Sequence, residues 1–463
     1  MPIKLYNTLT RKKEEFRPRK KGKANIYTCG PTVYWYQHIG NLRSYIFSDI
    51  LKKVLSYNHF KTRQVMNVTD VGHLTSDADT GKDKIEEAAR KEGKNAQEIA
   101  DYYLNIFKKD LKKLNISKPD IWAKATDHIK EQIELIKKLE KKGFTYKTKD
   151  GLYFDTSKLK DYGKLARLNI KGLKAGKRIS IREKKNKTDF ALWKFSEKPG
   201  TRQQEWNSHW GVGFPGWHIE CSAMSIKYLG EQFDIHTGGE DHISVHHTNE
   251  IAQSESATGK KPWVKYWLHG AFLVFRGEKV SKSKGGLYTL SQLEKQNFES
   301  LSYRYLCLNT HYKKRLEFSI KSLESAQNTF NKLKNIITEL KTKKDSKGNT
   351  KEYREKFLNA INDDLNIPKA LGIFWNALKD KNLGSRQKYE LALEFDKIFG
   401  LSLKELKSQT PQTIPKEIQQ LAEQRQKARA QKDFTASDKL RKKLQSLGYT
   451  IEDTKKGPFV KKI

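Results

Sequence analysis

Cysteine is scarce in this chain: only three occur among 463 residues, and no two form a Cys-x-x-Cys pair. A disulfide-stabilised scaffold is therefore excluded, and the composition fits a reducing compartment. Apolar runs that approach the ~20 residues of a membrane helix are also lacking, which excludes a helical membrane protein. The N-terminus carries no charged-then-apolar signal pattern, so we expect a cytoplasmic location and no membrane partner.

Acidic residues are few beside basic ones: 54 Asp and Glu against 91 Lys and Arg give a net charge of +37. Hydrophobic residues make up only 36%, but 9 Trp, 20 Tyr and 21 Phe are enough to anchor globular cores. The length suggests two to four domains. The charge fits a nucleic-acid binder, and it fits equally well a Lys-rich bias spread over solvated faces, so charge alone does not decide the function.

The first clear pattern is a β-α-β unit. Residues 25–28 have the composition of a short strand, and Cys29-Gly30-Pro31 interrupts it. Leu42, Ile46, Ile50 and Val54 then recur every four residues, which predicts a helix. Residues 62–68 predict a second strand. Two strands around one helix indicate a parallel sheet of the nucleotide-binding type.

The residue composition and its periodicity change twice further along the chain. Gly and Pro punctuate 150–205, which we interpret as an insertion that splits the sheet domain. Strands are predicted again at 233–236 and 268–275, with a helix from about Ser244 between them. Beyond 320 the pattern is helical, although the charged stretch 341–356 is interpreted as a linker.

His38-Ile39-Gly40-Asn41 stands where the first predicted strand passes into its helix. A helix N-terminus offers unpaired N–H groups and a partial positive charge, both of which favour phosphate. Gly40 lets a ligand approach the backbone, and His38 and Asn41 add hydrogen-bond donors for a developing negative charge. A helix cap with an incidental histidine explains the same residues, so this motif alone leaves both interpretations open.

Lys279-Val280-Ser281-Lys282-Ser283 is a second candidate phosphate-binding segment, in a loop after a predicted strand. Two lysines three residues apart can clamp a triphosphate in the transition state and release it afterwards. A solvated basic loop explains this segment by itself. Two such motifs about 240 residues apart, each following a strand of one sheet, are harder to explain as coincidence.

The two motifs resemble the HIGH and KMSKS signatures of class I aminoacyl-tRNA synthetases, with Asn41 for the last His and Val280 for Met. The resemblance implies that an amino-acid carboxylate attacks the α-phosphate of ATP and that pyrophosphate leaves. The aminoacyl group then passes to the terminal adenosine of tRNA. The implied catalytic residues are His38, Asn41, Lys279 and Lys282; the implied ATP-binding residues, with Mg²⁺ on the ATP, are His38, Gly40, Asn41 and Lys282.

Cys29, Cys221, His246 and Glu250 form a candidate metal site. His246 and Glu250 are four residues apart, so they share one helix face and can chelate one ion. Thiolates with an imidazole select zinc. Taken alone, each cysteine is more commonly explained as a small buried core residue; we interpret the third, Cys307, as core.

The segments around these four residues resemble cysteinyl-tRNA synthetases: Cys29–Tyr34, Gly216–Met224, Phe233–His236 and His246–Ser254. The resemblance implies one zinc per chain on Cys29, Cys221, His246 and Glu250, with the substrate thiolate on the same ion. Cysteine and serine differ mainly in sulfur against oxygen, which an apolar pocket separates poorly and a thiolate-preferring metal separates well. The implied residues around the substrate L-cysteine are Gly30, Thr69, Trp217 and His236.

The resemblance extends over nearly the whole chain and implies an α/β fold. A Rossmann-type parallel-sheet catalytic domain is split by an insertion and is followed by an α-helical bundle and a small C-terminal anticodon-binding domain. The expected divisions are 1–125 and 205–270 for the two sheet halves, 126–204 for the insertion, 271–322 for the KMSKS-loop and stem-contact region, 323–407 for the bundle and 408–463 for the anticodon-binding domain.

Three features depart from the family pattern. Thr248 replaces a usual Glu, Gly286 stands where Asn usually follows the second motif, and the end, Gly457-Pro458-Phe459, lacks the expected Trp. None of these is a proposed zinc ligand. The missing Trp concerns the detailed anticodon contacts only.

Two alternatives remain beside a monomeric enzyme whose partners are ATP, L-cysteine and the tRNA for cysteine. A relative that joins cysteine to a small amine without tRNA would use the same two-step chemistry, but it would not need the basic helical region 325–463. A nucleic-acid-binding protein with an inactive nucleotide fold would not need His38, Asn41, Lys279 and Lys282 together with four metal ligands.

Overall fold

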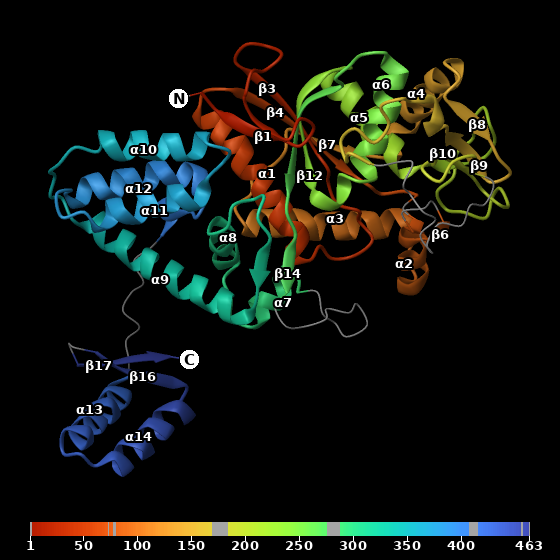
Figure 1. Ribbon diagram of the computed structural model, residues 1–463. Helices are drawn as coiled ribbons and strands as arrows, with labels where there is room; N and C mark the ends of the chain where they lie inside the picture. The colour runs from red at the N-terminus through yellow and green to blue at the C-terminus, as the bar shows by residue number, and fades with distance from the viewer. Residues whose placement is uncertain are drawn as a thin grey trace. The chain divides into compact units, whose positions relative to one another are not determined.

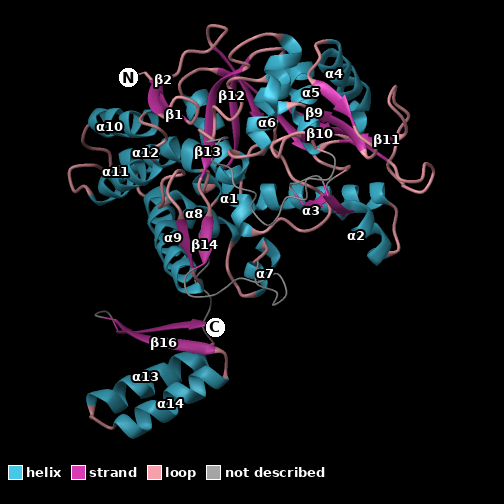
Figure 2. Ribbon diagram, turned by 45° about the vertical axis from the view of Figure 1, so that its right-hand side comes forward, coloured by secondary structure: helices cyan, strands magenta, loops and turns pink. Residues whose placement is uncertain are grey.

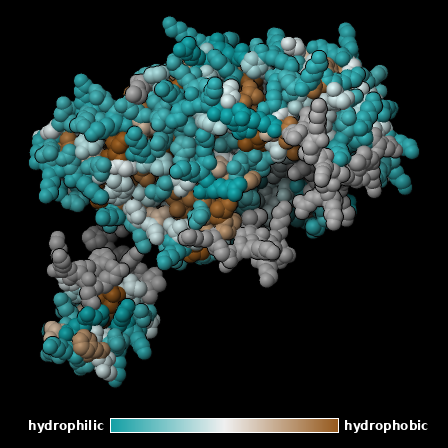
Figure 3. All heavy atoms as spheres, viewed as in Figure 1, coloured by the Kyte–Doolittle hydropathy of each residue, from teal (hydrophilic) through white to brown (hydrophobic). Residues whose placement is uncertain are grey.

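The structure is a computed structural model that describes residues 2–72, 74–76, 80–168, 184–275, 288–406, 415–454 and 457–462. Its contacts divide the chain into two compact units, Met1–Glu405 and Leu406–Ile463. The larger unit holds the sheet and most of the helices (Figure 1). No helix among the described residues is long and apolar enough to cross a membrane. The face of the molecule seen in Figure 3 is mostly hydrophilic.

A five-stranded sheet forms the centre of the larger unit, and all its neighbouring strands run parallel. Its order is β13-β12-β3-β4-β7, so the chain builds outward from β3 in both directions. The predicted α/β fold with a parallel sheet is confirmed. The strands are β3 (Lys23–Thr28), β4 (Lys61–Val68), β7 (Ile121–Lys124), β12 (Phe233–Gly239) and β13 (Val264–Gly270).

Helices cover both faces of this sheet, because its strands are buried on both sides. On one side α1 packs against β4 and β12, and on the other α5 packs against β4 and α6 (Figure 1). Tyr27 and Val65 pair across β3 and β4 and enter the core with Met224 of α5. The helices of this part are α1 (Ile39–Tyr57), α2 (Lys84–Glu92), α3 (Ala96–Lys113), α4 (Ile129–Lys141), α5 (Trp217–Leu229) and α6 (His246–Thr258).

The expected insertion forms a second, antiparallel sheet with the order β11-β10-β9-β8. Its strands are β8 (Thr145–Lys147), β9 (Gly151–Phe154), β10 (Phe190–Phe195) and β11 (Gly213–Pro215). The last strand lies beyond residue 204, where the sequence analysis ended the insertion. A strand of three residues is too short to show a period of two in the sequence.

Three pairs of short strands and a bundle of helices complete the larger unit. The strands are β1 (Lys4–Asn7) with β2 (Lys12–Glu15), β5 (Leu74–Ser76) with β6 (Thr80–Asp83), and β14 (Leu273–Phe275) with β15 (Leu316–Phe318). The helices are α7 (Leu290–Lys295), α8 (Ser300–Leu308), α9 (Ile320–Thr342), α10 (Lys351–Asn362), α11 (Ile367–Lys379) and α12 (Ser385–Phe399). Figure 2 shows α9 to α12 grouped beside the sheet.

Two expectations for this region are wrong. The single strand expected at 268–275 is divided between the end of β13 and all of β14. The linker expected at 341–356 ends early, because α10 begins at Lys351. The first turns of α10 are exposed and charged, and its buried residues begin only at Phe357, so the sequence shows no apolar stripe at its start.

The smaller unit pairs two helices with a two-stranded antiparallel sheet. Its elements are α13 (Lys416–Ala430), α14 (Phe434–Ser446), β16 (Tyr449–Thr454) and β17 (Gly457–Lys462). It has a small core of its own, formed by Ile418, Leu421, Ala422, Leu444, Ile451 and Val460.

Candidate active site

A cleft of about 980 Å³ opens at the carboxyl ends of β3 and β12. Cys29 and Gly30 line it from the end of β3, and His38 and Asn41 line it from the start of α1. The chain leaves the sheet centre in opposite directions at this point, which is where open α/β sheets bind ligands. The volume lies at the upper end of the range for small-molecule sites.

His38 and Asn41 cap α1 and each other. The backbone N–H of Asn41 donates to His38 Nδ1 at 3.2 Å, and the backbone N–H of His38 donates to Asn41 Oδ1 at 3.3 Å. Because Nδ1 accepts, a neutral His38 carries its proton on Nε2. At Gly40, a Cβ would lie 2.9 Å from the His38 ring, so a larger residue would displace the imidazole. The helix-cap interpretation of this motif is therefore true, and the cap fixes the tautomer of a residue that lines the cleft.

Lys279 and Lys282 lie outside the described residues, because 276–287 are not described. Both flanks of that segment contact the start of α1. The backbone N–H of Ile39 donates to Tyr288 O at 2.9 Å, and Thr289 pairs with His38 in an isolated bridge. On the other flank, Arg43 Nη1 donates to Ala271 O and Phe272 O at 2.6 and 2.7 Å. The described residues on either side of 276–287 thus contact α1 at or near the first motif.

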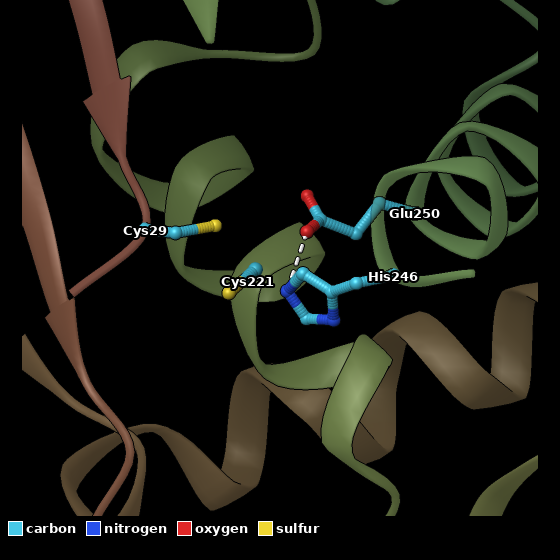
Figure 4. A group of neighbouring side chains, drawn as sticks. All are labelled: Cys29, Cys221, His246 and Glu250. Atoms are coloured by element: carbon cyan, nitrogen blue, oxygen red, sulfur yellow. Dashed lines mark ion pairs between the residues drawn. The ribbon is translucent and has the colours of Figure 1, made fainter. Parts of the chain in front are cut away.

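Cys29, Cys221, His246 and Glu250 converge from three separate elements (Figure 4). Cys29 follows β3, Cys221 lies on α5, and His246 and Glu250 lie one turn apart on α6. All four are buried, and their potential ligand atoms lie within 4.8 Å of one another. His246 Nε2 is 2.8 Å from Glu250 Oε1. Cys29 also lines the cleft, so the group adjoins the phosphate motif.

Burial and mutual contact set the protonation of this group. Burial raises the pKa of Cys29 well above its usual range, and Cys221 and Glu250 raise it further. Burial also raises the pKa of Cys221, but hydrogen bonds with Cys29 and His246 bring it down to about 6. Burial lowers the pKa of His246, but Glu250 and Cys221 raise it to about 10. Cys29 and His246 therefore hold protons that a metal ion would displace.

The donor set fits zinc. Zinc bonds of about 2.0–2.3 Å place tetrahedral donors roughly 3.3–3.8 Å apart, which small side-chain rotations reach from the present positions. Burial raises the pKa of Glu250, but the imidazoles of His236 and His246 lower it to about 2, so it is a carboxylate at neutral pH. Zinc binds sulfur, imidazole nitrogen and carboxylate oxygen, and this group offers two, one and one of them.

Two family models match the chain. The one described as "tRNA synthetases class I (C) catalytic domain" matches residues 15–328, and the one described as "Cysteinyl-tRNA ligase anticodon binding domain" matches 412–460. Cysteine–tRNA ligase 1 of Burkholderia lata is 46% identical over 458 residues, which cover 99% of this chain and 96% of the relative.

The chain belongs to the cysteine–tRNA ligase family of class I tRNA synthetases.

Other members of the family are similarly close. The cysteine–tRNA ligase of Treponema denticola is 45% identical over 98% of both chains. That of Thermococcus onnurineus is 39% identical over the full length of both. Among solved structures, a methionyl-tRNA synthetase of Mycobacterium tuberculosis in complex with methionyl-adenylate has a TM-score of 0.58 at 16% identity. That structure covers 82% of this chain, with 88% of its own chain covered, and supports the fold.

Of the four residues expected around the amino acid, two line the cleft and two are buried behind its wall. Gly30 and Trp217 line the cleft, and the Trp217 ring stacks on His246 with centroids 4.2 Å apart. Only glycine fits at position 30, because a Cβ there would lie 1.7 Å from the carbonyl oxygen of Asn67. Thr69 and His236 are buried. His236 Nε2 lies 2.9 Å from Glu250 Oε2, so it orients a proposed metal ligand.

The sequence analysis missed a row of buried polar groups behind Cys29. Cys29 Sγ lies 3.2 Å from His247 Nε2, His247 Nδ1 lies 2.7 Å from His269 Nε2, and His269 Nδ1 lies 2.8 Å from Thr8 Oγ1. Burial lowers the pKa of both histidines, so both rings are neutral. His247 adjoins His246 in the sequence, a signal that was available. His269 lies within the strand expected at 268–275, where a single histidine forms no motif that would mark it.

Glu220 is a second missed residue. It precedes Cys221 on α5, and its Oε2 accepts a hydrogen bond from Thr69 Oγ1 at 3.1 Å. Burial raises the pKa of Glu220 well above its usual range, and the nearby Cys221 and Asp70 raise it further. A buried carboxyl group with a raised pKa therefore lies beside Cys221, one of the four residues of the candidate metal site. A single Glu beside a cysteine gives no warning of this in the sequence.

Proposed function

We propose that this enzyme ligates L-cysteine to its cognate tRNA through a cysteinyl-adenylate. The observation that carries the proposal is the position of Cys29, which belongs to the group of four metal-ligating side chains and also lines the cleft beside His38 and Asn41. One site that holds both thiol-selective donors and a phosphate-binding helix start fits the activation of cysteine by ATP.

In the first step, the carboxylate of cysteine attacks the α-phosphorus of ATP and pyrophosphate leaves. His38 donates from Nε2 to the phosphate oxygens, and Asn41 and the N–H groups at the start of α1 add to this stabilisation. Gly40 keeps the backbone open to the phosphates. Lys279 and Lys282, with Mg²⁺ on the ATP, neutralise the departing pyrophosphate. The contacts that both flanks of their segment make with α1 support this assignment.

Cys29, Cys221, His246 and Glu250 hold zinc in this proposal. When bound, the ion supplies a site that prefers the thiolate of cysteine to the hydroxyl of serine. Trp217 packs against His246 and covers the side chain of the substrate, while Gly30 leaves room for its backbone. Thr69 and His236 do not line the cleft; Thr69 positions Glu220, and His236 positions Glu250.

In the second step, the aminoacyl group passes to the terminal adenosine of tRNA. The smaller unit, Leu406–Ile463, carries 14 Lys and Arg against 6 Asp and Glu and is assigned to anticodon binding in a monomeric enzyme. Ligation to a small amine would need no such unit. The match of residues 412–460 to an anticodon-binding domain therefore favours tRNA.

The test is the fate of labelled cysteine. Purified enzyme, ATP, Mg²⁺ and unfractionated tRNA should convert labelled cysteine into acid-precipitable material that ribonuclease releases. Label that enters a small soluble product with an added amine, and none in tRNA, would contradict the proposal.

A further inference from the structure

Four aromatic rings form a continuous patch that starts in the cleft and runs out of it. Trp35 and Tyr36 line the cleft from the connection between β3 and α1. Both contact Tyr103 of α3, with ring centroids 5.6 and 5.3 Å apart. Tyr103 in turn contacts Tyr102, at 5.1 Å. We call Trp35, Tyr36, Tyr102 and Tyr103 the aromatic rim.

The outer members of the aromatic rim face solvent. Trp35 is 55% exposed and Tyr102 is 44% exposed, so both leave large ring surfaces uncovered. Tyr103 is buried beneath them, and its hydroxyl donates to Glu92 at 2.6 Å. The buried Tyr103 therefore supports the rim from below, while the exposed ring surfaces of Trp35 and Tyr102 contribute little to the stability of the fold. Exposed aromatic surface grouped in one place marks an interaction site.

A cation lies at the outer end of the aromatic rim, and another lies in the cleft beside it. Lys94 Nζ is 4.7 Å from the centroid of Tyr102, and Lys84, which lines the cleft with Trp35 and Tyr36, is 5.5 Å from the centroid of Tyr34. The nearby carboxylate of Glu92 is paired with Lys94 at 3.1 Å. Aromatic rings interleaved with lysines form the usual surface for single-stranded nucleic acid, whose bases stack while its phosphates meet the cations.

We propose that the aromatic rim stacks the unpaired nucleotides at the 3′ end of tRNA and guides them into the cleft. The inference rests on the proposed function, because transfer to the terminal adenosine requires that end of the tRNA to cross the edge of this cleft. The adenine of ATP could cover one ring inside the cleft. It leaves unexplained the continuation of the rim to Tyr102, which stands outside the cleft lining.

The experiment compares ring-keeping with ring-removing variants of the full chain. Trp35→Phe and Tyr102→Phe keep an aromatic face, whereas Trp35→Leu and Tyr102→Leu keep apolar volume without it. Each Leu variant should raise the KM for tRNA in cysteine charging by roughly 10-fold, because base–aromatic stacking is lost. Each Phe variant should keep a KM for tRNA close to that of the wild type. Tyr102→Leu should leave cysteine-dependent pyrophosphate exchange, which uses no tRNA, unchanged.

A second arm locates the effect on the RNA. Binding is measured for intact tRNA and for the same tRNA trimmed of its unpaired 3′ nucleotides. Trimming should weaken binding to the wild type, and it should have little further effect on Trp35→Leu and Tyr102→Leu. Equal weakening of intact and trimmed tRNA in the variants would overturn the proposal. So would a raised KM for ATP in exchange with no change for tRNA, which would assign the rim to adenine. An absence of exchange in the wild type would instead refute the proposed function.

Discussion

At the scale of single residues, burial and mutual contacts set the protonation of the candidate metal site. We call its residues, Cys29, Cys221, His246 and Glu250, the metal group. Cys221 and Glu250 have pKa values of about 6 and 2, so both are anionic at neutral pH even though burial opposes their charge. His236 supports Glu250 from behind, at 2.9 Å. Only Cys29 and His246 must lose a proton for all four to act as ligands.

Loss of one sulfur should empty the metal group. We expect one zinc per chain in the wild type and less than about a tenth of that in Cys221→Ser. The variant keeps three ligands and has a hydroxyl in place of one thiolate, and such a site binds zinc far more weakly. Cys307→Ser is the matched control. Cys307 is buried elsewhere, against Tyr303 and Arg43, and its loss should leave zinc content intact. Elemental analysis after dialysis measures both, and equal zinc in the two variants would contradict the assignment.

Residue patterns in the sequence predicted Cys29, Cys221, His246 and Glu250 as a metal site, and the structure brings these four together. The proposed phosphate-binding motifs were found in the same way, since motif residues keep their neighbours in the chain. The patterns did not identify His247, His269 or Glu220. His247 lies against Cys29 and His269 lies against His247, whereas Glu220 accepts a hydrogen bond from Thr69; such contacts between distant segments depend on how the elements pack. The protonation of the group was equally beyond prediction, because burial and neighbouring charges set it.

At the scale of elements, α1 connects the residues proposed to bind ATP with the segments around β14 and β15. His38 caps the start of α1, Asn41 lies in its first turn, and Arg43 follows two residues later. The buried guanidinium of Arg43 donates to four backbone carbonyls: Ala271, Phe272, His311 and Lys314. One side chain therefore fixes α1 against both segments that flank β14 and β15.

Arg43→Gln should separate catalysis from cysteine binding. We expect kcat for pyrophosphate exchange to fall roughly 10- to 100-fold, because a shift of about 1 Å between the motifs misplaces ATP. The KM for cysteine should change little, since the metal group is carried by the end of β3 and by α5 and α6, which Arg43 does not contact through its hydrogen bonds. Arg17→Gln removes an exposed guanidinium and should match the wild type. Steady-state exchange kinetics decide the matter; a raised KM for cysteine with unchanged kcat would contradict this role.

Elements with strong periodicity were predicted well and short ones poorly. The four-residue spacing that starts at Leu42 predicted α1, and the buried stripe of α9 followed from its spacing in the same way. β11 and β14 have three residues each, and the first turns of α10 have no buried side chains. Tertiary pairing defines such elements, so the sequence alone does not show them.

At the scale of the whole molecule, a buried ion network joins the sheet domain to the helical bundle. Asp49 of α1 accepts from Arg304 of α8 at 2.6 Å and from Lys53 at 2.7 Å. Arg304 also donates to Phe399 O, at the end of α12. Burial raises the pKa of Asp49, but Arg304 and Lys53 lower it to about 2. The charged carboxylate thus holds three helices together.

Acid should weaken this junction. The pKa of Asp49 is lower in the folded chain than in the unfolded one, so its contribution is present above about pH 4 and is lost as the pH falls toward 2. The contribution is about 2 kcal/mol at neutral pH. Asp49→Asn removes the carboxylate that faces the buried Arg304 and the partly exposed Lys53, and it should lower the melting temperature strongly at pH 7. The difference from wild type should shrink between pH 4 and 2, and the exposed control Asp127→Asn should show no such trend. A difference that is constant with pH would contradict the account.

The two compact units should separate the two chemical steps. A chain ending at Glu405 keeps the cleft, the metal group and the helical bundle, so we expect its cysteine-dependent pyrophosphate exchange to stay within about twofold of the full chain. Charging of tRNA should fall at least 10-fold, with a weaker dependence on salt, because phosphate contacts made by the basic unit are gone. Filter assays of charging at two salt concentrations measure this. Unchanged charging by the truncated chain would contradict the anticodon-binding role.

The most direct measurement is pyrophosphate exchange into ATP by the full chain, with cysteine and with serine compared at matched concentrations. Selection through a metal-held thiolate predicts a preference for cysteine, in kcat/KM, that exceeds the roughly 100-fold limit of a pocket that reads shape alone. The preference should fall with the zinc content of the sample. Comparable exchange with serine, or a preference that survives complete removal of zinc, would contradict the account.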